Sequence, residues 1–164
     1  MKIHTQAIAY IAASPETVYS TLTTPHNFPS YFRGFGPVPG VSHEALPDGK
    51  IRYEVGILRK MYNEDTSVLT EKITELEYPN LFAYEIVSGI PVPFSLLVNH
   101  GRSVWNCLPH NHGTLLEWHY IVTLTSVAAY PLAFPLVRFF MRKSMQHCLL
   151  TIKINMEKSI PATA

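Results

Sequence analysis

One long helical pattern closes the chain, and this feature most restricts the possible folds. It begins between Ala129 and Leu136 and runs to about Lys158. Apolar residues recur along it at helical spacing, at Val137, Met141, Met145, Cys148 or Leu149, Ile152 and Met156. Basic residues lie mostly on the opposite side, so the helix presents a single apolar stripe. The rest of the chain must supply the surface against which that stripe packs.

For about 90 residues before this helix, the sequence shows strand patterns only. Apolar alternation is interrupted by turn signals such as Pro47-Asp48-Gly49 and Tyr78-Pro79-Asn80. In one run Ile51, Tyr53, Val55 and Ile57 alternate with Arg52 and Glu54, and of these Tyr53 and Val55 are expected to face inward. The predicted strands are 38–46, 51–57, 67–76, 81–87, 97–108 and 114–125.

The N-terminal part predicts one strand, over residues 3–12, followed by two short helices. Ser14-Pro15-Glu16 has the pattern of a helix start: serine caps free amide groups, proline suits the first turn, and glutamate favours the positive end of the dipole. Pro25 ends this helix. A second helical turn is expected to end at Gly34.

The predicted order is therefore one strand, two short helices, about six strands and one long helix. A strongly bent antiparallel sheet needs an element to cover its concave face, and one long helix is available. We therefore predict an α+β fold with six to seven antiparallel strands wrapped around the C-terminal helix. Because one helix cannot fill such a trough, a cavity between sheet and helix is expected. Residues 1–164 are predicted to form a single domain.

Composition excludes several classes of function. The net charge is +1 and no run of Lys and Arg exceeds two residues, which argues against nucleic-acid binding. The two cysteines, Cys107 and Cys148, do not make a disulfide framework and are interpreted as small core residues. No run approaches the roughly 18 apolar residues that span a bilayer, and the protein is predicted to be cytoplasmic.

Three local patterns resemble a known family. Residues 13–19, ASPETVY, are similar to the family's small-residue, Pro, Glu, x, Val, aromatic start. Residues 84–91, YEIVSGIP, are similar to its junction ahead of the penultimate strand, and residues 113–118, GTLLEW, to the opening of its last strand. With their order and spacing, the chain from about residue 3 to 158 resembles the helix-grip fold of the START/Bet v 1-like superfamily, specifically its polyketide cyclase/dehydrase-like branch.

The resemblance implies an internal pocket for a hydrophobic or aromatic small molecule, such as a lipid or a polyketide. It does not imply a reaction, because members include cyclases, lipid and sterol carriers, hormone receptors and quinone-binding proteins. Binding is the leading hypothesis. The alternatives are a cyclase/dehydrase-type enzyme with a pocket tyrosine or histidine that transfers a proton, and an interaction module with a vestigial cavity. No cofactor is expected, and the sequence does not indicate an oligomeric state.

Strand parity and helix spacing select the candidate ligand-binding residues. In the last predicted strand, the face that includes Leu116, Trp118 and Tyr120 is more apolar than the face that includes Glu117 and His119, so the former is expected to face the cavity. The full candidate set is Tyr53, Val55, Tyr84, Ile86, Leu116, Trp118, Tyr120, Met141, Ser144 and Cys148. The tyrosines carry most weight, because a buried phenol needs a hydrogen-bond partner.

The stretch HNHGTLLEWHY, residues 110–120, crowds three histidines and a glutamate together and raises the question of a metal site. It matches the first half of the cupin metal motif. However, the second half needs several glycines downstream, and Gly113 is the last glycine of the chain. We predict no metal site. His100 is the candidate general acid or base if the protein is an enzyme, although the strand register leaves the orientation of His100 and Trp105 open.

Residues 129–143 combine bulky aromatic residues with three cations. One interpretation is that they form only the first turns of the core helix. The other is a portal in which residues 32–39 form the opposing lip. In this second interpretation the aromatic rings gate the cavity or touch a membrane transiently, while the cations meet acidic headgroups. The residues concerned are Phe134, Phe139, Phe140, Arg138, Arg142 and Lys143.

Overall fold

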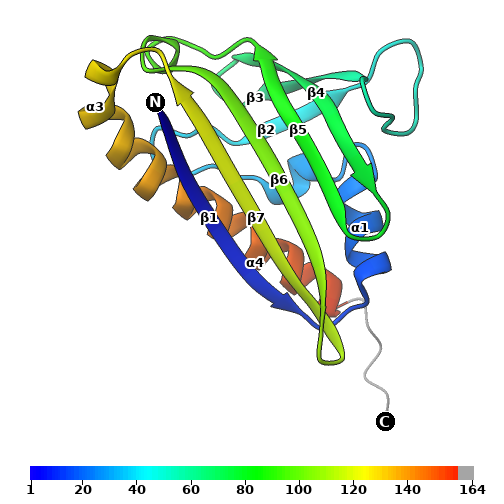
Figure 1. The fold of residues 1–164 in the computed structure, drawn as a ribbon. Coiled ribbons are helices and arrows are strands. Elements are labelled where there is room, and N and C mark those ends of the chain that lie inside the picture. The colour runs from blue at the N-terminus through cyan, green and yellow to red at the C-terminus, as the bar shows by residue number, and fades with distance from the viewer. Residues whose placement is uncertain (159–164) are drawn as a thin grey trace.

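The computed structural model describes residues 1–158 and contains one seven-stranded antiparallel sheet of order β1-β7-β6-β5-β4-β3-β2 (Figure 1). The helix-grip α+β fold predicted from the sequence is confirmed. The elements of the sheet are β1 (Lys2–Ile11), β2 (Val41–Ala45), β3 (Leu58–Asn63), β4 (Val68–Glu77), β5 (Leu81–Ser88), β6 (Val98–His110) and β7 (Gly113–Leu124). The remaining elements are α1 (Pro15–Thr23), α2 (Phe28–Tyr31), η1 (Phe94–Leu96), η2 (Val127–Ala129), α3 (Tyr130–Pro135), η3 (Leu136–Met141) and α4 (Arg142–Lys158). The predicted domain extends to residue 164, and residues 159–164 lie outside the described part of the chain.

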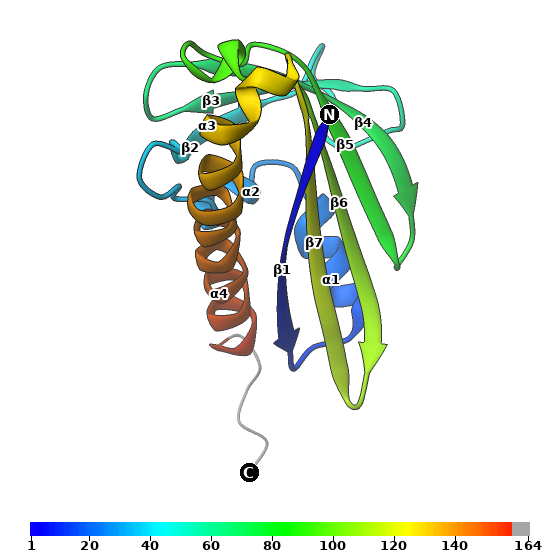
Figure 2. The same cartoon turned by 60° about the vertical axis from the view of Figure 1, so that its left-hand side comes forward.

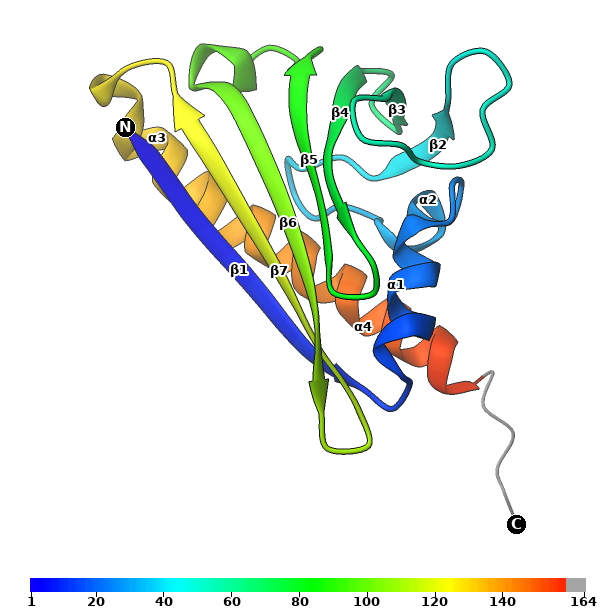
Figure 3. The same ribbon diagram turned by 45° about the vertical axis from the view of Figure 1, so that its right-hand side comes forward.

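The helices lie on one side of the curved sheet, as Figures 2 and 3 show from two directions. The C-terminal helical segment runs along the concave side and contacts β1. Helix α1 packs against β5, β6 and β7, and α2 packs against β2 and α4. The sheet and α4 therefore enclose the space in which the sequence predicted a cavity.

The predicted start of α1 is confirmed. The Thr17 N–H donates to the Ser14 side-chain oxygen at 3.4 Å, and Pro15 occupies the first turn. Capping of this kind satisfies one of the amides that a helix start leaves without a partner. It fixes the direction in which the chain leaves β1.

Strand β7 has the inward and outward faces that its alternation predicts. Leu116, Trp118 and Tyr120 are buried, whereas Glu117 and His119 are about one quarter exposed, at 23% of each side chain. The register pairs Trp118 with Trp105 of β6, and the two rings stack with centroids 3.9 Å apart. The cross-strand tryptophan pair left open by the sequence is thus present.

The strand predicted at 51–57 is wrong. The segment forms a loop with a turn in which the Ile57 N–H donates to the Glu54 carbonyl at 3.1 Å. Gly56 has a φ of +92°, a conformation that glycine adopts at little cost and that breaks a strand. As a result Tyr53 is buried but Val55 is 63% exposed, so the expectation that Val55 faces the cavity is also wrong.

The predicted C-terminal helix is present, but its first turns are irregular. It consists of α3, the π-helical segment η3 and α4 in direct succession. Pro135 lies at the junction of the first two, and a proline inside a helix removes a backbone hydrogen bond. Widened turns of this type occur often at functional sites. Among the described residues, no helix combines the length and the apolar character needed to cross a membrane.

Candidate functional site

An apolar chamber opens between the sheet and the C-terminal helical segment. Its volume is about 120 Å³. Residues of three segments form its mouth: the 38–39 loop, the 90–94 connection after β5, and η3. Deeper in, the lining comes from the sheet, with Leu69, Ile86, Val98, Tyr120 and Val122.

A second chamber of about 80 Å³ lies beside the first, toward β3 and β4. Both chambers are lined by Val38, Pro39, Asn63, Leu69, Tyr120 and Met141. Because they share these walls, they are the outer and inner parts of one cavity. Each part exceeds the roughly 10–15 Å³ that a single water molecule needs, so the interior is not fully packed.

The inner chamber has an aromatic wall. Trp118 lines the chamber, and the Trp105 ring stacks behind it. The indole N–H of Trp118 donates to the Ser103 hydroxyl at 2.8 Å. Phe28 and Phe32 meet the Trp118 ring edge-on, with centroids 6.1 and 5.9 Å away. These contacts hold the Trp118 ring in one orientation, and they place flat apolar surface beside the cavity.

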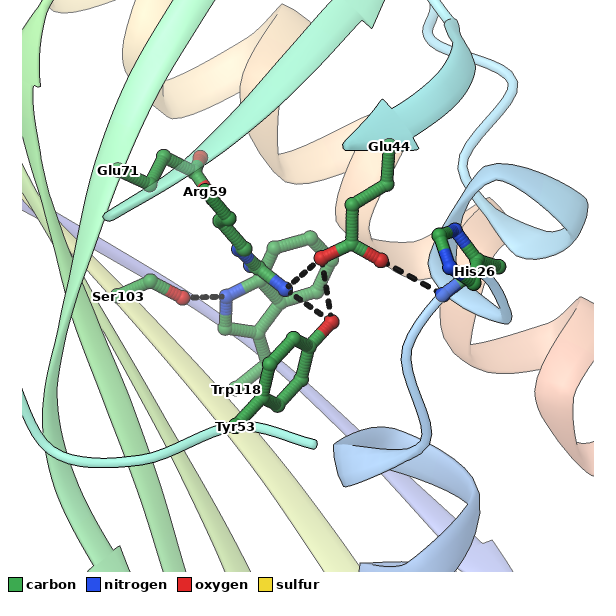
Figure 4. A network of polar contacts seen from close by, with 7 residues as sticks. All are labelled: His26, Glu44, Tyr53, Arg59, Glu71, Ser103 and Trp118. Atoms are coloured by element: carbon green, nitrogen blue, oxygen red, sulfur yellow. Dashed lines mark hydrogen bonds and ion pairs between the residues drawn. The ribbon is translucent and has the colours of Figure 1, made fainter. Parts of the chain in front are cut away.

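A buried network of charged side chains borders the inner chamber, and Figure 4 shows the network. Arg59 of β3 lies between two carboxylates. Its Nε donates to Glu71 Oε2 at 2.9 Å, and its Nη1 donates to Glu44 Oε1 at 3.2 Å. The Arg59 guanidinium also lies over the ring of Tyr84, 4.5 Å from the centroid. Of these groups, Glu71 and Tyr84 line the inner chamber.

The Tyr53 hydroxyl and the backbone N–H of His26 complete the network. The Tyr53 hydroxyl donates to Glu44 Oε1 at 2.6 Å and accepts from Arg59 Nη1 at 2.6 Å. The backbone N–H of His26 donates to Glu44 Oε2 at 2.6 Å. Glu44 is therefore fully engaged, and its charge is shared among three donors.

The network holds one cation for two carboxylates, so the charges do not balance if all are ionised. Burial raises the pKa of Glu71 above its ordinary value, and the nearby Arg59 guanidinium offsets only part of that rise. Burial likewise raises the pKa of Tyr84 and of Tyr120, so both phenols keep their protons at neutral pH. The polar groups of the inner chamber are thus one carboxyl with a raised pKa, two neutral phenols and the Asn63 amide.

The sequence-predicted candidates divide into three groups. Five of them line the cavity: Tyr84, Ile86, Trp118, Tyr120 and Met141. Four are buried elsewhere in the core and line neither chamber: Tyr53, Leu116, Ser144 and Cys148. The remaining one, Val55, lies exposed in the 51–57 loop and is not part of the site. Both cysteines are free and buried, as expected for core residues.

His100 and His119 lie on the outer face of the sheet, away from the cavity. His100 is on the outer face of the sheet, where its Nε2 lies 3.4 Å from Glu85. His119 also faces outward and meets His4 of β1, with ring nitrogens 3.1 Å apart. No histidine of the described residues lines either chamber. Among residues 1–158, no group of three or more histidine, cysteine, aspartate or glutamate side chains is arranged to hold a metal.

Sequence reasoning missed the residues that distinguish the inner chamber, namely Glu44, Arg59 and Glu71. Strand parity carried a signal for two of them. Arg59 shares its face of β3 with the buried Met61, and Glu71 shares its face of β4 with the buried Ile73. A charge on the inward face of a strand is rare enough to indicate a buried pair.

The segments predicted to form a portal meet at the mouth of the cavity. Phe35 of the 32–39 loop contacts Phe139 and Phe140, each with ring centroids 6.1 Å apart. A Cβ atom at Gly36 would come within 2.6 Å of the Phe140 ring, so the loop approaches the helix closely. The lip and the helix are therefore in contact at this end of the cavity.

Solved structures of other proteins share this fold. Norcoclaurine synthase from Thalictrum flavum, solved with dopamine and hydroxybenzaldehyde, matches with a TM-score of 0.71 and 12% identity, over 98% of this chain and 89% of that one. Ginseng major latex-like protein 151 from Panax ginseng matches with a TM-score of 0.67 and 12% identity, over 94% and 97% of the two chains. A protein from Nitrosospira multiformis matches with a TM-score of 0.67 and 16% identity, over 95% and 96%. At these identities the likeness shows the fold alone.

The sequence itself matches one family model. No curated protein sequence matches the chain. The model described as polyketide cyclase / dehydrase and lipid transport matches residues 2–157, which is nearly the whole chain. The sequence patterns, the helix-grip fold and this match agree, and the chain belongs to the polyketide cyclase/dehydrase and lipid transport family.

Proposed function

We propose that this protein binds a hydrophobic or aromatic small molecule, such as a lipid or a polyketide, in the cavity between the sheet and the C-terminal helix. The observation that carries the proposal is the continuous apolar cavity with a mouth at η3 and an inner end at Glu71. Concave apolar sites with a few polar groups at fixed positions are typical of small-molecule binding. The fold of the family supports the same conclusion.

In this proposal the ligand contacts residues of both chambers. Ile86 and Met141 pack against its apolar body in the outer chamber. Trp118, Tyr84 and Tyr120 contact the part that reaches the inner chamber. Tyr53, Leu116, Ser144 and Cys148 support these walls from the core without touching the ligand.

A titration with 1-octanol tests the proposal, because the two tryptophans of the chain form the stacked pair beside the inner chamber. We expect a saturable change in tryptophan fluorescence and a stoichiometric complex in native mass spectrometry. Leu69→Trp, which enlarges a side chain shared by both chambers, should abolish binding. Leu69→Met is the volume-conserving control. Equal binding by Leu69→Trp and wild type would refute a ligand in the cavity.

The second candidate is a cyclase/dehydrase-type enzyme, and the observation that favours it is the set of polar groups in the inner chamber. The form with a histidine base is disfavoured because no described histidine lines the cavity. A phenol whose pKa is raised by burial, as for Tyr84 and Tyr120, donates hydrogen bonds more readily than it accepts protons. Glu71, whose pKa is raised by burial, is the remaining acid or base among the described residues that line the inner chamber, and binding stays the leading candidate.

Transient contact with a lipid surface is part of the proposal. Exposed apolar residues gather at the mouth, from η1 and its approach and from η2, α3 and η3; they are Val92, Leu96, Val127, Leu132, Phe134 and Phe139. Thr125, which follows β7, links the start of the C-terminal segment to the end of η1. Its N–H donates to the Leu97 carbonyl and its hydroxyl donates to the Leu96 carbonyl. No Asp or Glu occurs in residues 118–156, whereas Arg138, Arg142 and Lys143 lie there. Such a surface fits an anionic bilayer.

Vesicle sedimentation tests this contact. The protein should partition onto vesicles containing phosphatidylserine more than onto pure phosphatidylcholine vesicles. The double variant Leu132→Ser/Phe139→Ser should lose most of the binding. Ile51→Ser is the matched control, because Ile51 is 79% exposed in a loop outside the mouth. Equal loss in the control variant would contradict a defined docking surface.

A further inference from the structure

Glu71 is a charged residue in the wall of a mostly apolar cavity, whose other polar side chains are Asn63, Tyr84 and Tyr120. It is 5% exposed, and it lines the inner chamber from β4. Arg59 engages only one of its oxygens: Nε and Nη2 lie 2.9 and 2.8 Å from Oε2. No described residue donates a hydrogen bond to Oε1. Oε1 is not among the fully enclosed side-chain atoms of the described residues that lack a partner, so it keeps accessible surface that a donor from a ligand can reach.

Glu44 and Glu71 differ in how many of their carboxylate oxygens receive hydrogen bonds. Glu44 receives hydrogen bonds on both oxygens, from Tyr53 and Arg59 on one and from the His26 backbone on the other. The network thus satisfies one carboxylate completely and leaves one oxygen of the other unpaired, at the point where the cavity ends. This oxygen is therefore open to a donor from outside the protein.

The charge of the network restricts the group that Glu71 can accept. One guanidinium already serves two carboxylates, so a ligand carboxylate would add a third negative charge in a buried place. A ligand ammonium group would balance the charge of the network, but it would lose its full hydration on entering a mostly apolar chamber. A neutral hydroxyl avoids both costs, and donates a charge-assisted hydrogen bond to a carboxylate.

We propose that the inner chamber selects ligands that carry a hydroxyl group on an apolar body, and that this hydroxyl donates to Glu71 Oε1. The inference rests on the proposed function and names the polar group of its ligand. Glu71 is then a specificity-determining residue, and Arg59 positions it. The surrounding Trp118 and Met61 side chains supply apolar contact, whereas the neutral Tyr84 and Tyr120 hydroxyls and the Asn63 amide are weaker acceptors than a carboxylate.

Two isomers separate this inference from general hydrophobic binding. 1-Octanol and 1-methoxyheptane have the same atoms and nearly the same size, but only the alcohol has an O–H to donate. Both are titrated against the wild-type protein at neutral pH, with tryptophan fluorescence as the readout. A hydrogen bond to a charged acceptor predicts that the alcohol binds at least about tenfold more tightly than the ether.

The variant E71Q is the direct test of the residue. Arg59 Nε needs an acceptor, so the glutamine oxygen should turn toward Arg59 and leave the amide N–H group facing the chamber. The alcohol preference should then fall to about equal affinity for the two isomers. E71Q leaves Arg59 and Glu44 as a balanced pair, so the fold should persist, which circular dichroism checks. E75Q is the matched control, because Glu75 lies on the same strand but pairs with Arg102 on the outer face.

Each outcome decides one statement. A preference for the alcohol in wild type and E75Q that disappears in E71Q supports the inference. Equal affinity for alcohol and ether in wild type overturns it, while the proposed function stands. A preference that survives in E71Q also overturns it, since the acceptor then lies elsewhere. If neither isomer binds the wild-type protein, the proposed function fails as well.

Discussion

The two halves of the sheet line the same cavity with opposite chemistry. Strands β1, β6 and β7 are long and regular, and the inward face of β7 is apolar or aromatic from Leu116 to Leu124. Strands β2, β3 and β4 turn Glu44, Arg59 and Glu71 inward instead. One half therefore gives the cavity its apolar surface, and the other gives it a polar end.

This difference separates two roles that a buried residue can have. The apolar half gains stability from every contact it makes. The charged half gains little, because buried ion pairs lose in hydration much of what they gain in attraction. The charged half of the wall loses hydration, and the cavity beside it is not filled by protein atoms. Ligand recognition explains this arrangement better than stability does.

The largest change in unfolding free energy is expected when the cation of the charged network is removed. Arg59→Met removes the only cation between two buried carboxylates, and should lower the free energy of unfolding by about 3–5 kcal/mol. Denaturant unfolding followed by circular dichroism measures the change. Arg102→Met is the control, because Arg102 pairs with Glu75 and Glu85 on the half-exposed outer face. Its loss should cost less than about 1 kcal/mol. Equal losses would remove the distinction between the two sites.

A smaller effect is expected in the apolar half. Ser103→Ala removes the acceptor of the buried Trp118 indole N–H and should cost about 1–3 kcal/mol of unfolding free energy. Ser42→Ala is the matched control: its hydroxyl donates to the Tyr62 carbonyl at 2.8 Å, but the residue is exposed, so water replaces the bond. A Ser103→Ala protein as stable as wild type would mean that the tryptophan orientation does not depend on this bond.

The smallest expected effect is a change in pH dependence. Burial raises the pKa of Glu71 in the folded state, so the folded protein holds this proton more tightly than the unfolded chain. The stability that this proton contributes is present below the usual carboxyl pKa of 4.5, and is lost as the pH rises through the folded-state pKa. The unfolding free energy of wild type minus that of E71Q should therefore decrease as the pH rises from 4.5. An increase over that range would reverse the assigned direction.

The regular half could be predicted from the sequence, and the charged half could not. Around Trp118, alternation alone separates inward from outward residues, because β7 is paired on both sides and has no irregularity in its pairing with β1. Around Tyr53 the same alternation fails, because Gly56 takes a left-handed conformation that the sequence pattern does not reveal. The cavity followed from the order of helices and strands. Parity within a strand indicates only that Arg59 and Glu71 face inward, whereas their pairing with Glu44 depends on contacts between β2, β3 and β4.

Carbon-13 methyl spectra of the methionines test the central claim most directly. The chain has five methionines. Met141 lines both chambers and Met61 lines the inner one, whereas Met1 is exposed and Met156 lies on α4 outside both linings. Titration with 1-octanol should shift the Met141 and Met61 methyl signals in a saturable way, and leave Met1 and Met156 unchanged. Saturable binding that shifts Met1 or Met156 but neither Met141 nor Met61 would contradict a ligand site in this cavity.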